Sequence, residues 1–595
     1  MGERVRAVLL VLTTAFRTDP WRATAVLVMN LGVSLSSVLF GLWLKFLVDG
    51  ATHHDMGTVL FAAIAIAVSF SFLMIAAMSQ YVFASRLSEE TAQAFDEELM
   101  TISARLPGLE HHERPEYLDK LNLLRTDRWT LSSSVWAVFI NIGLVAQVIG
   151  SVVLLARLDL LLLLLPLFAI PYVVLGGRAQ MLILNAGEEA AEPGRLAQAM
   201  RQLGLTASPA KEIRISGLQE NLRRDHRAAS DAALAPMARA QARGALYNAA
   251  GSVIFAVGFV GATLVVVVRA SRGQASLGDV VLAMTLASQV NQQVSGAVGA
   301  LSWLLQTLRG VSRFLWLRDY AVSAARPRGS TVPVPARITR GIDLEAVSFR
   351  YPGTEAEVLR DFSLHIPAGA TVAIVGENGA GKTSLVKLLE RFYEPTSGRI
   401  LVDGIDIRDF AVEQWRDRHS ACFQDFANFA FKLRETVGVG DLARIDDLPR
   451  VEAALAAANG LDITERLDHG FDTQLTKLFE GGVDLSGGQW QKLALGRAMM
   501  RDEPLVLVLD EPSSGLDAQA EHSLFERYAG AARQGAARNG AITVLVSHRF
   551  STVRMADLIV VIDGGRPTEV GSHAELIALG GLYAELYEIQ ASAYR

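Results

Sequence analysis

The stretch Gly376-Glu377-Asn378-Gly379-Ala380-Gly381-Lys382-Thr383 decides the fold of the second half of this chain. It follows an apolar run, Thr371–Val375, that predicts a β-strand, and it precedes Ser384–Phe392, which predicts a helix. A glycine-rich turn between a strand and a helix lets backbone N–H groups and the helix N-terminus converge on phosphate oxygens. We therefore expect an α/β fold with a phosphate-binding loop at this turn.

The side chains of this loop indicate what it binds. Lys382 is placed to reach the β- and γ-phosphates of a nucleoside triphosphate, and the Thr383 hydroxyl is placed to hold Mg²⁺. The other expected nucleotide-binding residues of the loop are Gly376, Asn378, Gly379, Ala380, Gly381 and Ser384.

A second apolar run, Leu505–Leu509, ends in Asp510-Glu511. Apolar residues at every position predict a central parallel strand that is buried on both faces. Ligands of such sheets bind beyond the carboxyl ends of the strands. We therefore expect Asp510 to bind Mg²⁺ and Glu511 to polarise an attacking water molecule.

The first half of the chain has a different character. The 595 residues are 51% hydrophobic and 20% charged, and the mean hydropathy is +0.28. Six long stretches contain no Asp, Glu, Lys or Arg, and a bilayer core needs about 20 helical residues. The six predicted spans are Ala23–Leu44, Gly57–Ser85, Trp129–Ala156, Leu160–Gly177, Gly244–Val268 and Val280–Leu308.

Basic residues predict the orientation of these spans. Most of them lie in the loops Arg86–Arg128 and Arg178–Arg243, which should face the cytoplasm together with the N-terminus and the second half. The opposite, short loops carry only Lys45, Arg157, Arg269 and Arg272 near the span ends. We interpret Lys45 as an anchor whose long side chain reaches the membrane interface.

The two long loops have a helical composition, so helices should extend from the spans by tens of ångströms, at about 1.5 Å per residue. Each loop has a break in its middle, at His111–Tyr117 around Pro115 and at Ala207–Ile213 around Pro209. Two interpretations remain open on the residues alone. The breaks are either ordinary hairpin turns or tips that touch another domain.

Polar residues within the last span share one helix face. Gln289, Gln292, Gln293 and Gly296 have i, i+3, i+4, i+7 spacing. Polar groups are costly in lipid, so this face should meet protein or water. Hydrogen bonds between helices and a wet, solute-contacting cavity remain equal alternatives.

Between the two predicted nucleotide-site strands lies Leu485-Ser486-Gly487-Gly488-Gln489. With the phosphate loop before it and Asp510-Glu511 after it, the sequence resembles the ATP-binding cassette (ABC) superfamily. Over nearly its whole length the chain resembles a bacterial exporter-type half-transporter. The resemblance implies an all-α six-helix transmembrane domain (1–324), a linker (325–337), and an α/β P-loop NTPase cassette with a helical subdomain (338–595).

The resemblance also implies roles for single residues. Tyr351 looks like the aromatic residue that stacks on adenine, and Gln424 like the glutamine that senses Mg²⁺ and the attacking water. His548 resembles the switch histidine at the γ-phosphate. Asp517 matches a loop at the dimer interface, and Glu480 an acidic position that contacts the membrane-domain loops.

In the family, the turn Ser486, Gly487, Gly488 and Gln489 completes the ATP site of the other subunit. Two copies would therefore enclose two ATP molecules with Mg²⁺. A homodimer is sufficient, and a heterodimer is not excluded. The loop tips near Pro115 and at Lys211-Glu212-Ile213 resemble coupling helices that rest on the cassettes.

These resemblances lead us to expect an ATP hydrolase that drives export across a bacterial plasma membrane. The substrate is an amphiphilic molecule, with a peptide natural product as the first hypothesis, because Phe423–Phe426 and Trp490 resemble cassettes of peptide exporters. A lipid or multidrug flippase is the alternative, and an ATP-gated channel or sensor is a third. Lys492 and Gly515 depart from the commoner family pattern. A net charge of -6 gives no support to nucleic-acid binding.

Overall fold

The computed structural model describes residues 2–114, 117, 128–207, 209–324, 332–512, 530 and 533–593. The chain forms two compact units. The first comprises Met1–Ala104 and Lys120–Tyr320, and the second comprises Arg105–Asp119 and Ala321–Arg595. The tip of the first long loop therefore belongs to the second unit. Residues 325–331 of the expected linker lie outside the described residues.

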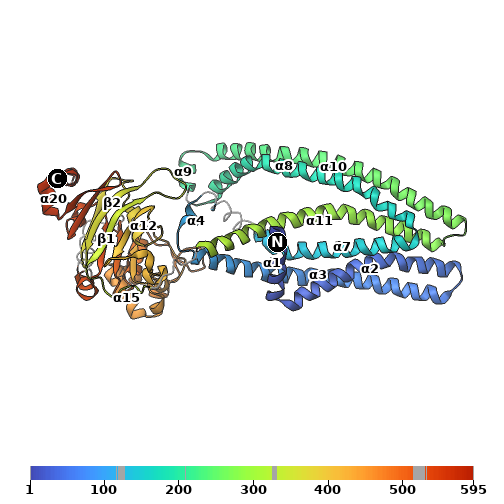
Figure 1. Ribbon diagram of the computed structural model, residues 1–595, viewed down its shortest axis with the longest axis horizontal. Helices are drawn as coiled ribbons and strands as arrows, with labels where there is room; N and C mark the ends of the chain where they lie inside the picture. Colours follow the sequence, from blue (N-terminus) through green and yellow to red (C-terminus); the bar gives the residue numbers. More distant parts are fainter. Residues whose placement is uncertain are drawn as a thin grey trace. The chain divides into compact units, whose positions relative to one another are not determined.

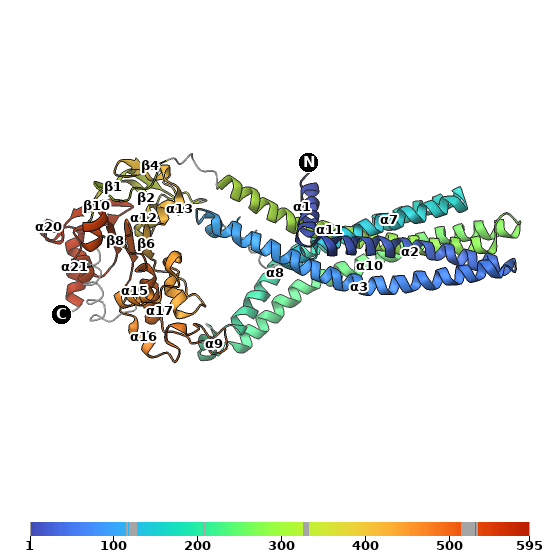
Figure 2. The ribbon, with the colours of Figure 1, turned by 90° about the horizontal axis from the view of Figure 1, so that it is seen from below.

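The first unit consists of helices, six of which are long (Figure 1). The long helices are α2 (Pro20–Thr52), α3 (Met56–Arg105), α7 (Ser134–Leu158), α8 (Leu165–Leu205), α10 (Gln219–Ser271) and α11 (Leu277–Ala324). The short helices are α1 (Glu3–Thr18), α6 (Arg128–Ser132), η1 (Leu160–Leu164) and α9 (Ala210–Ile215). Figures 1 and 2 both show α8 and α10 side by side along their length.

Local chemistry explains where these helices begin and turn. Asp19 caps α2 by accepting a hydrogen bond from the Arg22 backbone N–H at 2.8 Å, and Pro20 occupies the first turn. α3 continues without a break from apolar into charged sequence, and α10 from charged into apolar sequence, as the composition of the long loops predicted. The short helix α9 begins after Pro209, which confirms a helix at the break of the second loop.

Five helical segments of the described chain are long and apolar enough to cross a membrane, namely Pro20–Thr52, Met56–Arg105, Thr130–Leu158, Leu160–Leu205 and Gln219–Ser271. Their most apolar windows are only 11% to 28% buried within the protein, which leaves apolar side chains to face lipid. α11 is continuous over 48 residues but is not among the five. Five of the six predicted spans thus coincide with helices that are long and apolar enough to cross a membrane, and the sixth stays a prediction.

The glutamines of α11 make hydrogen bonds to neighbouring helices. Gln289 Nε2 donates to the Ser37 carbonyl of α2 at 2.6 Å, and Gln293 Nε2 donates to the Ser151 hydroxyl of α7 at 2.8 Å. Gln292, on the same helix, is exposed in the single chain. The interhelical alternative therefore accounts for Gln289 and Gln293, but it does not account for Gln292.

Lys45, which we interpret as an interfacial anchor, also makes an ion pair that the sequence does not predict. Its ammonium pairs with the Asp279 carboxylate at the start of α11, and one turn further along α2 Asp49 Oδ1 accepts the Gly278 N–H at 2.9 Å. A Cβ on Gly278 would lie 2.5 Å from the Lys45 carbonyl, so the two helices approach closely here. An acidic partner 234 residues away cannot be read from a span boundary.

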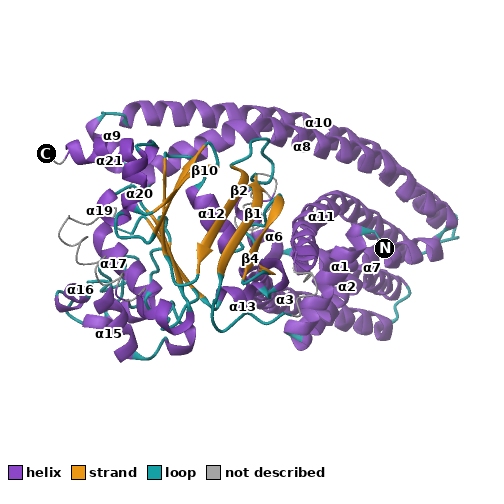
Figure 3. Cartoon of the chain, turned by 60° about the vertical axis from the view of Figure 1, so that its left-hand side comes forward, coloured by secondary structure: helices purple, strands orange, loops and turns teal. Residues whose placement is uncertain are grey.

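The second unit contains two sheets (Figure 3). An antiparallel sheet has the order β2-β1-β4-β5, and a mainly parallel sheet has the order β10-β9-β3-β8-β7-β6. The strands of the first are β1 (Gly341–Phe349), β2 (Leu359–Pro367), β4 (Ser397–Val402) and β5 (Ile405–Asp406). Those of the second are β3 (Thr371–Gly376), β6 (His419–Cys422), β7 (Val506–Asp510), β8 (Ile542–Val546), β9 (Leu558–Asp563) and β10 (Arg566–Gly571).

Both predicted nucleotide-site strands are confirmed, as β3 and β7. β7 lies between β8 and β6 and is buried at all of its positions, as its uniform apolarity predicted. The helices of this unit are α4 (Glu110–Glu113), α12 (Lys382–Leu389), η2 (Ile407–Asp409), α13 (Val412–Arg416), α14 (Leu433–Gly438), η3 (Leu442–Arg444), α15 (Leu448–Ala457), α16 (Leu461–Glu465), η4 (Gly470–Asp472), α17 (Gly487–Ala498), α19 (Phe550–Val553), α20 (His573–Leu579) and α21 (Leu582–Ala593).

The hydrophobic side chains of this unit form several separate cores. One lies between the sheets and includes Phe362, Leu385 and Trp415. Another joins α15 and α17 to one face of β6 and β7, and Figure 3 shows these helices gathered to one side of the strands. The single cysteine, Cys422, belongs to this second core, where burial raises the pKa of its thiol to about 12. A thiol this protonated is unreactive, so Cys422 acts as a small core residue.

Candidate functional site

The glycine-rich loop connects β3 directly to α12. Gly381 has a φ of 107°, which side chains rarely tolerate, and it precedes the first residue of α12. A Cβ on Gly376 would lie 2.3 Å from the Ile562 carbonyl oxygen of β9, so the chain passes too close for any larger residue. These two glycines let the backbone turn tightly. The N-terminus of α12 thus opens at the carboxyl end of the sheet, where an anion is favoured.

Lys382 lies folded over this loop. Its Nζ donates to the carbonyl oxygens of Gly376 and Glu377, both at 2.8 Å. Burial lowers the pKa of the Lys382 ammonium, while the charges of Glu511 and Asp510 act in the opposite direction. An ammonium held at the glycine-rich loop is suited to meeting the terminal phosphates of a nucleotide.

Asp510 and Thr383 are suited to holding a divalent cation. Asp510 is buried, and its Oδ2 lies 3.5 Å from the Thr383 hydroxyl. Its other oxygen, Oδ1, has no hydrogen-bond partner in the described part of the chain. Burial, and then the neighbouring charge of Glu511, raise the pKa of Asp510 to about 6. A bound cation would offset the cost of ionising a buried carboxylate. A carboxylate with a hydroxyl is the donor set that Mg²⁺ prefers.

Three predicted catalytic residues meet at the next position. Gln424 Nε2 donates to Glu511 Oε2 at 3.0 Å, and His548 Nδ1 lies 3.2 Å from Glu511 Oε1. Glu511 has a φ of 48°, a strained conformation for a residue with a side chain. The structure thus brings together Gln424, Glu511 and His548 from three separate segments, directly after the residue that fits Mg²⁺.

Tyr351 lies at the other end of the loop, beside α12. Its hydroxyl is 2.9 Å from the Ser384 hydroxyl, and its ring packs edge-on against Phe349 and Tyr393. It is half-buried, so part of the side chain remains available to a flat ligand. This placement agrees with the stacking role that the resemblance implied, which itself stays a prediction.

Ser486 and Gln489 form a capping box that opens α17. The Ser486 hydroxyl accepts the Gln489 N–H at 3.4 Å, and the Ser486 N–H donates to Gln489 Oε1 at 2.9 Å. Ser486 is exposed and Gln489 is half-buried. Asp517 and Pro115 lie outside the described residues, and the roles expected for them stay predictions.

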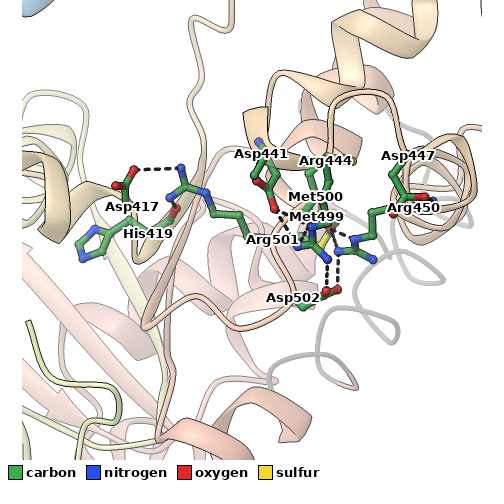
Figure 4. Close-up of polar contacts among 11 residues, drawn as sticks. Asp417, His419, Asp441, Arg444, Asp447, Arg450, Met499, Met500, Arg501 and Asp502 are labelled. Atoms are coloured by element: carbon green, nitrogen blue, oxygen red, sulfur yellow. Dashed lines mark hydrogen bonds and ion pairs between the residues drawn. The ribbon is translucent and has the colours of Figure 1, made fainter.

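Arginines hold the opposite end of α17 (Figure 4). Arg450 Nε donates to the Met500 carbonyl at 2.9 Å, and its Nη2 reaches both the Met499 carbonyl and the Asp502 carboxylate. Arg444 binds the same Asp502 carboxylate, and its hydrogen bond is the largest cause that lowers the pKa of Asp502. Charged donors at a helix C-terminus satisfy its last carbonyls and its dipole.

We expect Arg450→Ala to lower the stability of the cassette. The change removes the arginine donor of the Met499 carbonyl and one of the two arginine donors of the Met500 carbonyl, which should cost about 1–3 kcal/mol. Thermal unfolding of the full chain, followed by intrinsic tryptophan fluorescence, measures this. Arg466→Ala is the matched control, because that arginine is 71% exposed and its ion pair with Asp462 is long, at 3.8 Å. Equal melting temperatures for both variants would contradict the anchoring role.

Sequence reasoning missed two features of the site. Gln491 of α17 donates to the Glu511 carbonyl at 3.3 Å and so ties the turn helix to the strained residue. Lys387 and Tyr393 join the nucleotide side of the cassette to Glu113 of the first loop. Gln491 follows the turn by two positions, which is a weak signal. Nothing in the sequence pairs Glu113 with residues more than 270 positions away.

Comparisons with known proteins agree with this geometry. The profile of the family described as "ABC transporter" matches residues 359–514. An "ATP-dependent lipid A-core flippase" of Aromatoleum aromaticum is 37% identical over 321 residues, which are 54% of this chain and 51% of that protein. A protein of the same name from Pseudomonas aeruginosa is 37% identical over 319 residues, 53% of this chain and 50% of that protein. The chain thus matches about half the length of these curated relatives.

The fold comparison extends over almost the whole chain. The structure of a bacterial Atm1-family ABC exporter with ATP bound has a TM-score of 0.79 with this chain. The alignment covers 96% of this chain and 98% of the other at 24% sequence identity, a level that establishes the fold. A helical membrane domain with several apolar helices, followed by a C-terminal α/β P-loop cassette, is therefore confirmed as the fold class. Residues 359–514 thus match the "ABC transporter" family, and the chain as a whole shares the fold of an Atm1-family ABC exporter.

Proposed function

We propose that this protein is a half-transporter that uses ATP hydrolysis to move an amphiphilic, lipid-type molecule across a bacterial plasma membrane. The observation that carries the proposal is the cluster at the carboxyl end of β7. There, a buried Asp510 with a partnerless oxygen is followed by a strained Glu511 that contacts both Gln424 and His548. A chain that only gated a pore in response to ATP would not require this arrangement for hydrolysis.

Each residue of the cluster has a distinct task in this proposal. Lys382 leaves the Gly376 and Glu377 carbonyls to bind the terminal phosphates, and the N-terminus of α12 supports it. Glu511 orients the attacking water, and His548 faces the γ-phosphate. Thr383, Asp510 and Gln424 would hold Mg²⁺, which supplies charge neutralisation at the phosphates when bound. Tyr351 stacks on the base.

We further propose that two copies act together as a homodimer. Ser486 is exposed at the start of α17, and the contacts described above join Ser486 and Gln489 to each other. A turn of this kind can present its backbone and hydroxyl groups to ATP held by a second subunit. The coupling roles of α9 and of the first loop tip belong to the same proposal, as do a cytoplasmic cassette and N-terminus.

The substrate class follows the flippase alternative rather than the peptide hypothesis. Two relatives at 37% identity bear the name lipid A-core flippase. Trp490, one of the residues that suggested peptide export, is 7% exposed and packs in the core around α17. Phe423–Phe426 and Trp490 favour peptide export only through their resemblance to other cassettes, so peptide export stays a prediction with less support.

Transport in proteoliposomes tests this proposal. The purified chain is reconstituted with a fluorescent short-chain phospholipid, and loss of reducible dye in the outer leaflet is followed after ATP addition. We expect ATP-dependent redistribution that the Glu511→Gln variant does not support. Parallel vesicles receive a labelled amphiphilic peptide instead. Movement of the peptide but not of the lipid would overturn the lipid assignment, and ATP-independent movement of either would overturn the pump.

A further inference from the structure

The tip of the first long loop, defined here as Leu106–Arg114, packs on the cassette just behind the phosphate-binding helix. Arg416 Nη2 donates to the Pro107 carbonyl at 2.5 Å, and the Leu109 N–H donates to the Phe392 carbonyl at 3.4 Å. A Cβ on Gly108 would lie 3.1 Å from the same Phe392 carbonyl. Backbone therefore meets backbone at this contact, three residues beyond the end of α12.

Glu113 is the charged centre of this contact. Its Oε1 lies 2.8 Å from Lys387 Nζ, and its Oε2 accepts a short hydrogen bond from the Tyr393 hydroxyl. Burial and this hydrogen bond both raise the pKa of Tyr393, so the phenol stays a donor. Both carboxylate oxygens are thus occupied by groups of the cassette, which makes Glu113 a specific attachment point.

Lys387 connects this attachment to the residue expected to stack on the base. It belongs to α12, and its Nζ lies 5.2 Å from the centroid of the Tyr351 ring and 5.8 Å from that of Tyr393. The ammonium therefore contacts the Glu113 carboxylate and two aromatic rings at once. Tyr351 is also bonded to α12 through Ser384. One cation is shared between the loop tip and the base-side tyrosine.

We infer that binding of the nucleotide base at Tyr351 and attachment of the loop tip are coupled through Lys387, with Glu113 as the positioning residue on the loop. This inference rests on the proposed function and adds to it the route by which the base, as distinct from the phosphates, acts on the loop. A purine stacked on Tyr351 excludes water from the ring. Cation–π and ion-pair contacts of Lys387 strengthen when water is excluded.

Linkage makes the coupling reciprocal. If the base strengthens attachment of the loop tip, the attached loop tip must strengthen binding of the base by the same factor. The phosphates bind at the N-terminus of α12, whereas Lys387 lies more than a turn further along this helix, where it contacts Glu113 and the tyrosine rings. A ligand with phosphates but no base should therefore be insensitive to Glu113. The comparison of the two ligands distinguishes the coupling from a merely structural role of the Glu113 contact. A structural role would change the binding of the ligand with a base and of the ligand without one.

Titration calorimetry on the full chain in lipid nanodiscs, with EDTA present to prevent hydrolysis, tests the first half of this relation. The probes are ATP and inorganic tripolyphosphate. We expect Glu113→Gln to raise the Kd for ATP about fivefold, the lower end of common couplings, and to leave the Kd for tripolyphosphate within about twofold. Lys387→Met should have the same effect, and Lys387→Arg should restore part of it. Glu345→Gln, which removes the carboxylate of an exposed pair with Arg399, is the matched control.

Hydrogen exchange of the backbone at residues 106–114 tests the reciprocal half. ATP should slow this exchange in the wild type, whereas tripolyphosphate should not, and Lys387→Met should remove the difference. Equal shifts in Kd for both ligands, no shift for either, or exchange that ATP does not change would each overturn the coupling while wild-type ATP binding persists. A wild-type chain that binds no ATP would instead overturn the proposed function itself.

Discussion

Glu511→Gln is expected to bind ATP as the wild type does and to hydrolyse it at least about 100-fold more slowly, the scale of a lost general acid–base group. The residue has a φ of 48°, and its carboxylate oxygens face Gln424 and His548 separately. An amide of the same shape keeps the backbone strain and the volume of the side chain. It lacks the charge that orients water, and its NH₂ group can face the Gln424 donor.

Two measurements on the purified chain check this expectation. ATP binding is titrated at equilibrium, and phosphate release is measured under saturating ATP. Glu503→Gln is the matched control, because Glu503 makes a long, exposed pair with Arg538 at 3.8 Å on the same unit. Wild-type phosphate release by Glu511→Gln would show that another group orients the water. Loss of ATP binding would show that Glu511 has a structural role instead.

The parts of the site that could be predicted are those with local signals. The loop at Gly376–Thr383 is identified by its own glycines and by the strand and helix beside it, and the structure places β3 and α12 there. Asp510 and Glu511 follow a strand whose uniform apolarity is itself a signal of burial. Gln424 and His548 needed the family resemblance, because single residues in loops have no periodicity.

The parts that could not be predicted depend on contacts between distant segments. Glu113 and Lys387 are 274 positions apart, and Lys45 and Asp279 are 234 apart. Each of these residues looks like an ordinary solvated charge when it is seen alone. α11 shows the opposite difficulty, because Gln289 and Gln293 lower its apolarity while they bond to α2 and α7. The long stretch without charged residues predicted a span in α11. The hydrogen bonds to neighbouring helices explain why this helix carries polar side chains.

Lys382→Ala should differ from Glu511→Gln in its defect. It should lose affinity for the nucleotide, whereas Glu511→Gln should lose turnover alone. In the structure, Lys382 Nζ satisfies the Gly376 and Glu377 carbonyls, and its charge lowers the pKa of Asp510. Removing it deletes charge-assisted hydrogen bonds to the phosphates, each of which contributes about 1.5–3 kcal/mol. We therefore expect the Kd for ATP to rise by about 10- to 100-fold, since 1.4 kcal/mol corresponds to a factor of ten.

The variant also has an effect on pH dependence that distinguishes it from simple loss of a contact. Without the Lys382 charge, the pKa of Asp510 should rise further above 6. A larger fraction of the Asp510 carboxyl groups is then protonated at neutral pH. Because Mg²⁺ requires the ionised carboxylate, residual Mg·ATP binding by Lys382→Ala should increase more steeply from pH 6 to 8 than binding by the wild type. Lys477→Ala, which removes an ammonium that is 76% exposed, is the control. Unchanged affinity in Lys382→Ala would contradict the phosphate-binding loop, and an unchanged pH profile would contradict the electrostatic link between Lys382 and Asp510.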